Sequence, residues 1–284
     1  MSILRYTGIK YSNDGTEKVK DILAAEEMLK VVLNGEPFTI TMRSPGSEEE
    51  LIRGLLFTED IYKDRQEDPR IKIKERNNLG YPTLIEVRVN KKKLRSRYLN
   101  SRNLLSVSSC GICGKTELEM PKRSRTANLP GRQAGYKLQT LSPKEQLSPR
   151  TLEQMFIRMR KKQKTFDLSG GSHASAAFTL DGKMLAMQED IGRHNAVDKV
   201  IGSLLLKRKL GQAQVLLVSG RISYEIVSKC FMGGMAFLAA VSAPSSLAVD
   251  FSKELGITLM AFCRDGKFTV YSEAQRVAAR QTSH

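Results

Sequence analysis

The most constraining feature of the chain is a run of four apolar residues, Val215-Leu216-Leu217-Val218, that stands between two segments with helical character. A short continuous apolar run is typical of a strand buried on both faces of a sheet. The segment before it, Asn195 to Leu206, repeats apolar residues at helical spacing, and another helix is expected from about Tyr224. A buried strand flanked by helices predicts a sheet with helices packed against it.

The same alternation continues through residues 148–284. Strands are expected at about 236–241 and 257–262, separated by a helix from Ser246 to Leu255, and Asp181-Gly182 predicts a hairpin. A helix from Thr151 to Lys164, with Ser148-Pro149 at its start, opens this half. We therefore predict an α/β sandwich for residues 148–284.

Residues 1–105 predict a smaller α+β domain. Strands are expected at 26–33 and 38–42 around the turn at Asn34-Gly35, and two further segments, 71–74 and 85–89, alternate with the period of strands. Ser47 followed by Glu50 is a capping-box pattern, which predicts that Ser47 caps a helix running through Phe57.

The length, cysteine content and hydropathy of the chain indicate what class of protein it is and where it is located. With 284 residues and four cysteines, the chain can bury a core without the dense disulfides of small secreted domains. The first residues lack an apolar signal core, and the most apolar stretch, 232–244, is too short to span a bilayer. We expect a cytoplasmic protein with no membrane partner.

The chain is strongly basic. Its 46 Lys and Arg residues against 30 Asp and Glu residues give a formal charge of +16, which favours anionic partners. Nucleic acid is one such partner, but the absence of tryptophan and an aromatic content of 6% disfavour a surface that stacks on bases. A nucleic-acid-binding protein remains an alternative, and we expect no nucleic-acid partner.

Two of the four cysteines, Cys110 and Cys113, lie three residues apart in the stretch SSCGICGK. They fall within residues 106–147, a basic segment with little apolar periodicity that predicts a mobile loop. A structural zinc site would need two more ligands, and every other cysteine or internal histidine is distant in sequence. A dithiol oxidoreductase would place the pair at the start of a helix after a strand, which this segment does not predict.

Sulfur transfer is the third use of such a pair. A thiolate attacks a sulfur donor, holds the atom as a persulfide and passes it on. Gly111 and Gly114 leave room for a donor or acceptor to approach, and Lys115 favours the thiolate. This is the chemistry we favour for the pair.

Polar segments recur in the C-terminal half, chiefly where strands end or helices begin. SGGSHASA carries Gly170, Gly171 and His173, and a hydrogen-bonded core histidine explains it equally well. EDIGRHNAVDK and VSGRIS look like polar sites at helix starts, where free N–H groups bind anions; their candidate residues are Arg193, His194, Asn195, Ser219, Gly220 and Arg221. SAPSS, which ends at Ser246, and the segment 262–267 carry less weight, since an N-cap and a hairpin turn with exposed cations account for them.

Taken in order, SSCGICGK, SGGSHASA, EDIGRHNAVDKVIG, SGRIS and VSAPSSLAV resemble the FdhD sulfurtransferases, a family of formate dehydrogenase accessory proteins. The resemblance implies that Cys110 accepts persulfide sulfur from a cysteine desulfurase, that Cys113 assists or resolves, and that the sulfur goes to a molybdenum bis(guanine dinucleotide) cofactor before insertion into formate dehydrogenase. It also implies a homodimer and a cofactor-binding segment at Phe262, Cys263, Arg264, Asp265, Gly266 and Lys267.

The family's C-terminal domain is similar to the cytidine deaminase fold, so residues 148–284 are expected to form a cytidine-deaminase-like domain. Deaminase chemistry is not expected, because the zinc-binding His-x-Glu and Pro-Cys-x-x-Cys patterns are missing. The alternative function is that of a non-catalytic chaperone that binds the molybdenum cofactor and uses its cysteines for docking or redox sensing.

Overall fold

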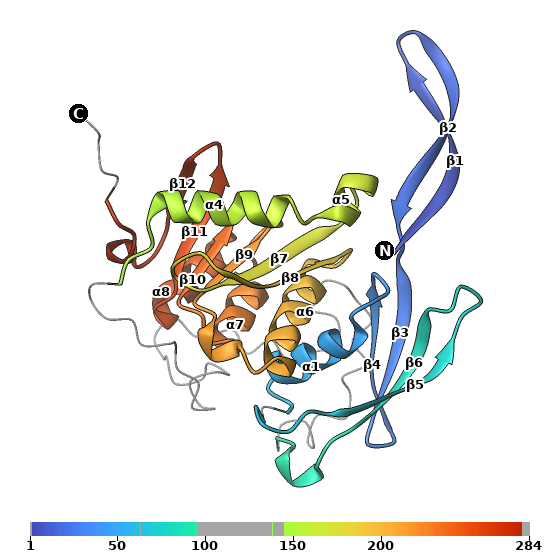
Figure 1. Cartoon of the computed structure of the whole chain (residues 1–284), viewed down its shortest axis with the longest axis horizontal. Coiled ribbons are helices and arrows are strands. Elements are labelled where there is room, and N and C mark those ends of the chain that lie inside the picture. The colour runs from blue at the N-terminus through green and yellow to red at the C-terminus, as the bar shows by residue number, and fades with distance from the viewer. Residues whose placement is uncertain (1, 63, 96–137, 139–144, 280–284) are drawn as a thin grey trace.

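The computed structural model describes residues 2–62, 64–95, 138 and 145–279. Its centre is a six-stranded sheet with helices on both faces (Figure 1), which confirms the mixed α/β prediction. In spatial order the strands are β12 (Lys267–Val270), β11 (Thr258–Arg264), β10 (Phe237–Ala240), β9 (Val215–Val218), β7 (His173–Phe178) and β8 (Met184–Asp190).

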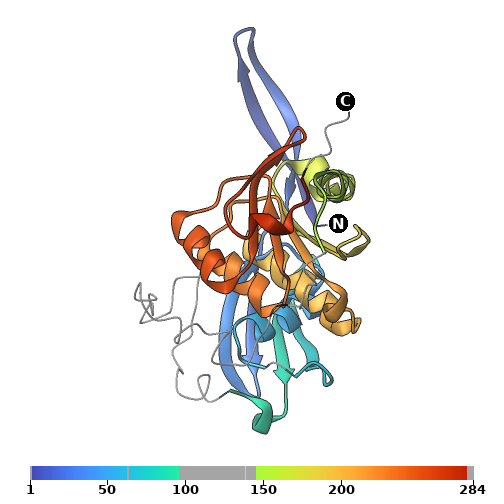
Figure 2. The ribbon, with the colours of Figure 1, turned by 90° about the vertical axis from the view of Figure 1, so that its left-hand side faces the viewer.

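Side chains of the central strands alternate between two apolar cores. Leu216 and Leu238 pack with helices α6 (Arg193–Leu206), α7 (Tyr224–Met232) and α8 (Ser246–Leu255), whereas Leu217 and Phe237 pack with α4 (Pro149–Arg160). Because consecutive strand residues face opposite sides, an entirely apolar strand requires helices on both. The result is a three-layer sandwich (Figure 2).

The N-terminal half adds a four-stranded sheet in the order β4 (Glu36–Arg43), β3 (Glu27–Leu33), β6 (Pro82–Arg88) and β5 (Arg70–Arg76). Helix α1 (Glu48–Thr58) packs its Leu51 and Leu56 on Leu29 and Ile85 of this sheet. Short 3₁₀ turns lie at Lys91–Lys93, Leu210–Gln212 and Ala274–Arg276.

Helix α1 joins the two halves through two glycines. A Cβ atom at Gly54 would overlap the carbonyl oxygen of Asp198, and one at Gly202 would overlap that of Glu50. The absent side chains let α1 and α6 cross with their backbones in contact. The predicted domain boundaries at residues 105 and 147 stay predictions, since 96–137 and 139–144 lie outside the described residues.

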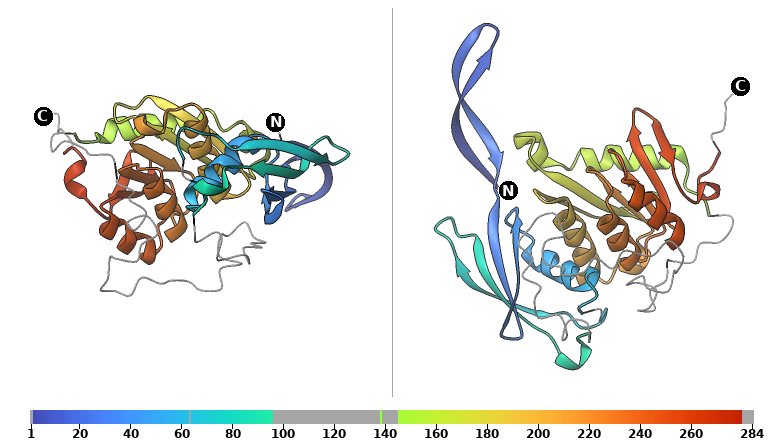
Figure 3. Two further views of the ribbon diagram at one scale, coloured as in Figure 1. Left: turned by 90° about the horizontal axis from the view of Figure 1, so that it is seen from below. Right: turned by 180° about the vertical axis from the view of Figure 1, so that it is seen from behind.

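A long hairpin precedes these elements and was not predicted. Strands β1 (Ile3–Ser12) and β2 (Gly15–Ala24) pair only with each other and rise away from the body of the protein (Figures 1 and 3). We call this hairpin the arm. Both of its faces are largely exposed along most of its length, so the sequence shows no strict apolar alternation there.

Two helix predictions are wrong in detail. Ser47 does occupy the N-cap position, but it adopts a left-handed conformation with a φ of 56°, and its hydroxyl donates to Oε1 of Gln188 at 3.3 Å and makes no capping bond. The helix expected to reach Lys164 ends at Arg160, and a separate short helix, α5 (Lys164–Ser169), follows. Within the described ranges, no helix has the length and apolarity needed to cross a bilayer.

Candidate functional site

The candidate site lies along one edge of the six-stranded sheet. Strands β9, β10 and β11 run parallel, so their carboxyl ends meet at this edge. Strand β7 is antiparallel to both β9 and β8, which brings the start of β7 and the end of β8 to the same edge. The edge therefore gathers all five polar segments that the sequence indicates: 170–173, 189–195, 219–223, 242–246 and 262–267.

Backbone hydrogen bonds tie neighbouring loops together along this edge. Ser219 donates its N–H to the Ala174 carbonyl at 2.9 Å and accepts the Ala174 N–H on its hydroxyl oxygen, also at 2.9 Å. Further along, the Ile222 N–H donates to the carbonyl oxygen of Ala243 at 3.1 Å. Loops that are far apart in sequence thus form one connected rim.

Gly220 is the point at which three of the predicted segments touch. A Cβ atom there would lie 3.1 Å from Nδ1 of His173 and 3.6 Å from Cβ of Arg193. The absence of a side chain lets the imidazole and the first turn of α6 approach the loop after β9. His173, Arg193, Gly220 and the exposed Arg221 therefore form one group, as the motifs predict.

The positive charge of this group comes from its arginines. Burial lowers the pKa of His173, and Arg193 and Arg221 lower it further, while Asp190 opposes them. The imidazole is therefore neutral at neutral pH. Arg193 keeps a buried Nε without a hydrogen-bond partner among the described residues. Leaving such a donor unpaired costs about 1–3 kcal/mol, which an anionic ligand could recover.

His194 and Asn195, both predicted to bind a ligand, are buried in the first turn of α6. Nε2 of His194 lies 3.4 Å from the Ser223 hydroxyl at the start of α7. Asn195 donates its amide to the Met42 carbonyl at 2.8 Å and to the Asp190 carboxylate at 3.1 Å. These contacts give both side chains a positioning role, and direct ligand contact by either stays a prediction.

Asp190 and Lys199 form a buried ion pair beneath the rim, with 2.7 Å between Nζ and Oδ2. The Asp190 carboxylate also accepts the backbone N–H groups of Ser44 and Gly192 at 3.2 and 2.8 Å. Lys199 donates to the Ser44 carbonyl at 2.9 Å. The pair thus fastens the loop after β4 to the start of α6.

Gly170 and Gly171 lie in the turn between α5 and β7. Gly170 ends α5 with a φ of 65°, in the left-handed region that glycine tolerates. A Cβ at Gly171 would lie 3.6 Å from the Ala24 side chain, at the end of β2. Glu189 caps the other end of α5 by accepting the Thr165 N–H at 2.9 Å. This turn is where the arm meets the rim.

Phe262 and Cys263 lie at an irregular position of β11. Phe262 has a φ of 55°, a costly conformation for a bulky residue, and donates its N–H to the Ser242 carbonyl at 3.2 Å. Its ring is 37% exposed. Cys263 is buried, which raises its pKa to about 12 and makes the thiol unreactive.

Residues 264–267 form a hairpin turn, which was the simpler interpretation of this segment, the other being a cofactor-binding site. Asp265 and Gly266 both have positive φ values between β11 and β12, and Arg264 faces Lys267 across the turn. Both cations are exposed. Together with Arg193 and Arg221 they give the rim four positive side chains, which favour a polyanionic ligand.

The predicted catalytic pair, Cys110 and Cys113, lies outside the described residues. Cys230, a minor candidate for zinc or redox chemistry, is fully buried, which raises the pKa of its thiol. In the described ranges, no three His, Cys, Asp or Glu side chains gather into a metal-binding group.

The chain is similar to known proteins over most of its length. The profile of the FdhD/NarQ family matches residues 24–278. This chain belongs to that family. The sulfur carrier protein FdhD of Streptomyces coelicolor is 40% identical over 270 residues, which cover 92% of this chain and 90% of that protein. The sulfur carrier protein FdhD of Mycobacterium tuberculosis is 40% identical over 265 residues, covering 90% and 92%.

A solved structure shares the fold. The crystal structure described as a formate dehydrogenase accessory protein from Desulfotalea psychrophila superposes with a TM-score of 0.71, covering 98% of this chain and 100% of its own. Its sequence identity of 21% limits this likeness to the fold. The family match includes the rim and both cysteines of SSCGICGK, whereas most of the arm precedes it.

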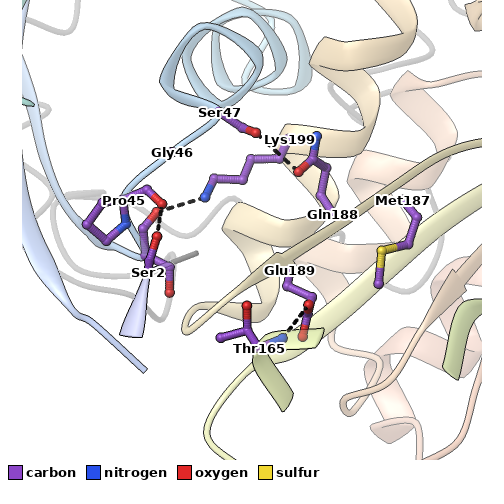
Figure 4. Close-up of a pocket in the computed structure, with 10 residues that line it drawn as sticks. Ser2, Pro45, Gly46, Ser47, Thr165, Met187, Gln188, Glu189 and Lys199 are labelled. Atoms are coloured by element: carbon purple, nitrogen blue, oxygen red, sulfur yellow. Dashed lines mark hydrogen bonds between the residues drawn. The ribbon is translucent and has the colours of Figure 1, made fainter. Parts of the chain in front are cut away.

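A polar cavity of about 250 Å³, which no sequence pattern predicts, is lined in part by Lys199 (Figure 4). The loop of residues 44–47 forms one wall, and Thr165, Gln188 and Glu189 form the other. Its lining mixes hydroxyl, amide and carboxylate groups. The cavity lies between this N-terminal loop and strand β8, which ends at the rim.

A second buried ion pair was also missed. Lys229 of α7 lies 2.9 Å from Asp198 of α6 and donates to the Thr58 hydroxyl at 2.9 Å and to Glu59 at 3.0 Å. Lys229 is 31 residues from Asp198 and 171 residues from Thr58 in the sequence, so no local pattern reveals these contacts.

Proposed function

We propose that this protein is a sulfur carrier that moves persulfide sulfur from a cysteine desulfurase to a molybdenum bis(guanine dinucleotide) cofactor, in support of formate dehydrogenase. Family membership carries this proposal, because relatives about 40% identical over most of the chain are named sulfur carrier proteins. The rim supplies the second support, since it offers cations and helix starts to an anionic cargo.

The cargo fits the rim by its chemistry. A bis(guanine dinucleotide) carries two pyrophosphates, and the buried unpartnered Nε of Arg193 is a donor suited to such an anion. Arg221, Arg264 and Lys267 add exposed positive charge nearby in the fold. The exposed Phe262 ring is available to stack on a guanine base.

The sulfur step follows from thiolate chemistry. The Cys110 thiolate attacks the terminal sulfur of the desulfurase persulfide; one S–S bond breaks, another forms on Cys110, and the desulfurase leaves as a thiolate. The Cys113 thiolate then attacks Cys110, forming a disulfide and expelling hydrosulfide, which becomes a ligand of the cofactor's metal. The two thiols supply both electrons, and a cellular thiol reductant restores them.

Three further predictions accompany this proposal: a cytidine-deaminase-like fold of the C-terminal sandwich, a homodimer and a cytoplasmic location. None of them is needed for the sulfur step. The proposed reaction also does not require zinc at the cysteine pair.

The test is sulfur loading of the purified protein. Wild type, Cys110→Ala and Cys113→Ser are incubated with cysteine and a desulfurase, then analysed by intact mass spectrometry and by cyanolysis. Wild type and Cys113→Ser should gain about 32 Da, the mass of one sulfur atom, and release thiocyanate. Cys110→Ala should do neither. Cys113→Ser should hold its sulfur without activating formate dehydrogenase.

Two outcomes would overturn the proposal. A chaperone that only escorts the cofactor would yield no thiocyanate from any variant, yet would still bind guanine nucleotide. Sulfur uptake by Cys110→Ala equal to that of wild type would exclude the assigned carrier.

A further inference from the structure

The arm is the part of the described chain that the proposed function leaves unused. It contains two ten-residue strands paired in register from Ile3 with Ala24 to Ser12 with Gly15. A lone two-stranded hairpin is only marginally stable in water. A partner that buries one of its faces would stabilise it.

The register divides the charged residues of the arm between its two faces. Residues directly opposite in an antiparallel pair share a face, as do alternate residues along each strand. One face therefore carries Arg5, Ile9, Tyr11, Lys18, Lys20 and Ile22, and we call it the cationic face. The acidic residues of the strands, Glu17 and Asp21, lie on the other face, where Glu17 pairs with Lys10 at 3.3 Å.

The cationic face combines unpaired charge with exposed apolar surface. Arg5, Lys18 and Lys20 form no ion pair with any residue that the structure describes. Ile9 and Tyr11, farther along the same face, are 65% and 77% exposed. Cations interleaved with exposed apolar side chains fit a protein surface that is acidic around an apolar spot.

The base of the arm places this face beside the rim. Ala24, on the cationic face, lies so close to the turn before His173 that a Cβ added at Gly171 would be 3.6 Å from its side chain. The Ala25 N–H donates to the Ser2 carbonyl at 2.8 Å, which closes the base of the hairpin. A protein bound along the cationic face would therefore lie next to the rim (Figures 1 and 3).

We propose that the cationic face of the arm docks the enzyme that receives the cofactor, through an acidic surface of that enzyme. The choice of partner rests on the proposed function: cargo held on the rim leaves from the side on which the arm stands, toward its recipient. The desulfurase needs only to reach Cys110. A solved structure with the same fold is described as a formate dehydrogenase accessory protein, which makes that enzyme the recipient to test.

A second copy of this chain fits the cationic face less well. Two such faces packed together by a twofold axis would place two sets of Arg5, Lys18 and Lys20 in one interface. Like charges in an interface oppose association. An acidic partner meets no such penalty.

The experiment measures binding of the full-length protein to purified, cofactor-free formate dehydrogenase from the same organism. The triple variant Arg5→Glu/Lys18→Glu/Lys20→Glu should raise Kd by about tenfold or more, and raising the salt concentration should weaken wild-type binding. A second variant, Ile9→Ser/Tyr11→Ser, changes only exposed apolar side chains and should weaken binding while leaving its salt dependence unchanged.

The matched control reverses three exposed cations at the opposite edge of the sheet, Lys207, Lys209 and Lys253, near the carboxyl ends of α6 and α8. This control has the same net charge as the triple arm variant but should keep wild-type affinity. Sulfur loading and guanosine diphosphate binding should be unchanged in every arm variant.

The outcomes separate this inference from the proposed function. If wild type does not bind cofactor-free formate dehydrogenase, or if the arm variants bind it as wild type does, the docking proposal is wrong even when sulfur loading succeeds. If the arm variants weaken binding of the desulfurase but not of formate dehydrogenase, the arm docks the desulfurase and the proposal is wrong. If the control variant at the opposite edge weakens binding of formate dehydrogenase as much as the triple arm variant does, net charge alone explains the loss and the docking proposal is wrong. Failure of sulfur loading with intact docking would instead overturn the proposed function.

Discussion

Helix α6 has two contrasting halves. Its first turn, with Arg193, His194 and Asn195, faces the rim and makes polar contacts to several loops. Its middle crosses α1 at Gly202 so closely that no side chain fits. One helix thus carries a polar site at its start and a rigid attachment farther along, and the attachment fixes where the site stands.

Two buried ion pairs hold the middle of the helix, through its neighbouring residues Asp198 and Lys199. Asp190–Lys199 fastens the loop after β4 to the rim, whereas Asp198–Lys229 fastens the end of α1 to α7. Both pairs are almost completely buried. If the two pairs have these separate roles, breaking Asp190–Lys199 should weaken ligand binding, whereas breaking Asp198–Lys229 should lower only the stability of the fold.

The largest expected effect is that of Lys229→Met. It leaves the Asp198 carboxylate buried without its cation, which should lower the free energy of unfolding by about 3–5 kcal/mol. Urea denaturation measures this loss. The double variant Asp198→Asn/Lys229→Met should regain part of it, since no unpaired charge remains. Protein that is still folded should bind guanosine diphosphate with wild-type affinity, and a large loss of affinity would contradict the division of roles.

Asp190→Asn should have the next largest effect, and of a different kind. An amide keeps one acceptor oxygen but loses the charge that pairs with Lys199, so stability should fall by about 3 kcal/mol. Because one oxygen cannot serve both Lys199 and the pair of Gly192 and Asn195, the start of α6 should shift, and the Kd for guanosine diphosphate should also rise by about tenfold. Calorimetric titration of folded protein measures this Kd. Asp250→Asn makes the same change on an exposed part of α8 and should alter neither quantity.

Much of the rim could be predicted from sequence. The apolar run 215–218 and the alternation around it fixed a layered sheet, and the rule that parallel strands end at one edge then brought the motifs at His173, Arg193 and Gly220 together. The Asp265-Gly266 turn was equally accessible, because its residue types tolerate positive φ.

Other features could not be predicted from the sequence, and the structure shows why. The arm exposes both faces, so burial imposes no alternation on its sequence. Ser47 matched a capping pattern, but its hydroxyl donates to Gln188 of β8, a contact 141 residues away in the sequence. The partners of Asp190 and Lys229 include Ser44 and Thr58, which only the crossing of α1 with α6 brings near. Local patterns carry no information on such long-range contacts.

Gly220→Ala tests the rim with a smaller perturbation. The added methyl would lie 3.1 Å from the His173 ring, so the ring must shift by a few tenths of an ångström. We expect a stability loss of about 1 kcal/mol and a several-fold weaker affinity for guanosine diphosphate. Thermal unfolding and titration calorimetry measure these. Gly211→Ala is the matched control, because a Cβ there meets nothing within 4 Å. Equal behaviour of the two variants would show that the packing at Gly220 does not matter.

The smallest effect concerns pH, and it sharpens the contrast at the start of α6. The pKa of His173 is lowered from 6.5 by burial first and by Arg193 and Arg221 next. Between that lowered value and 6.5 the unfolded chain binds more protons than the folded one, so stability falls as the pH drops below 6.5. In His173→Gln this component should disappear, which urea denaturation at several pH values between 5 and 7.5 would detect. Bound guanosine diphosphate should reduce the wild-type loss, because an anion beside the arginines makes protonation of the imidazole less costly. An identical pH profile in wild type and variant would mean that His173 is solvated, and that the arginines do not converge on it as the structure indicates.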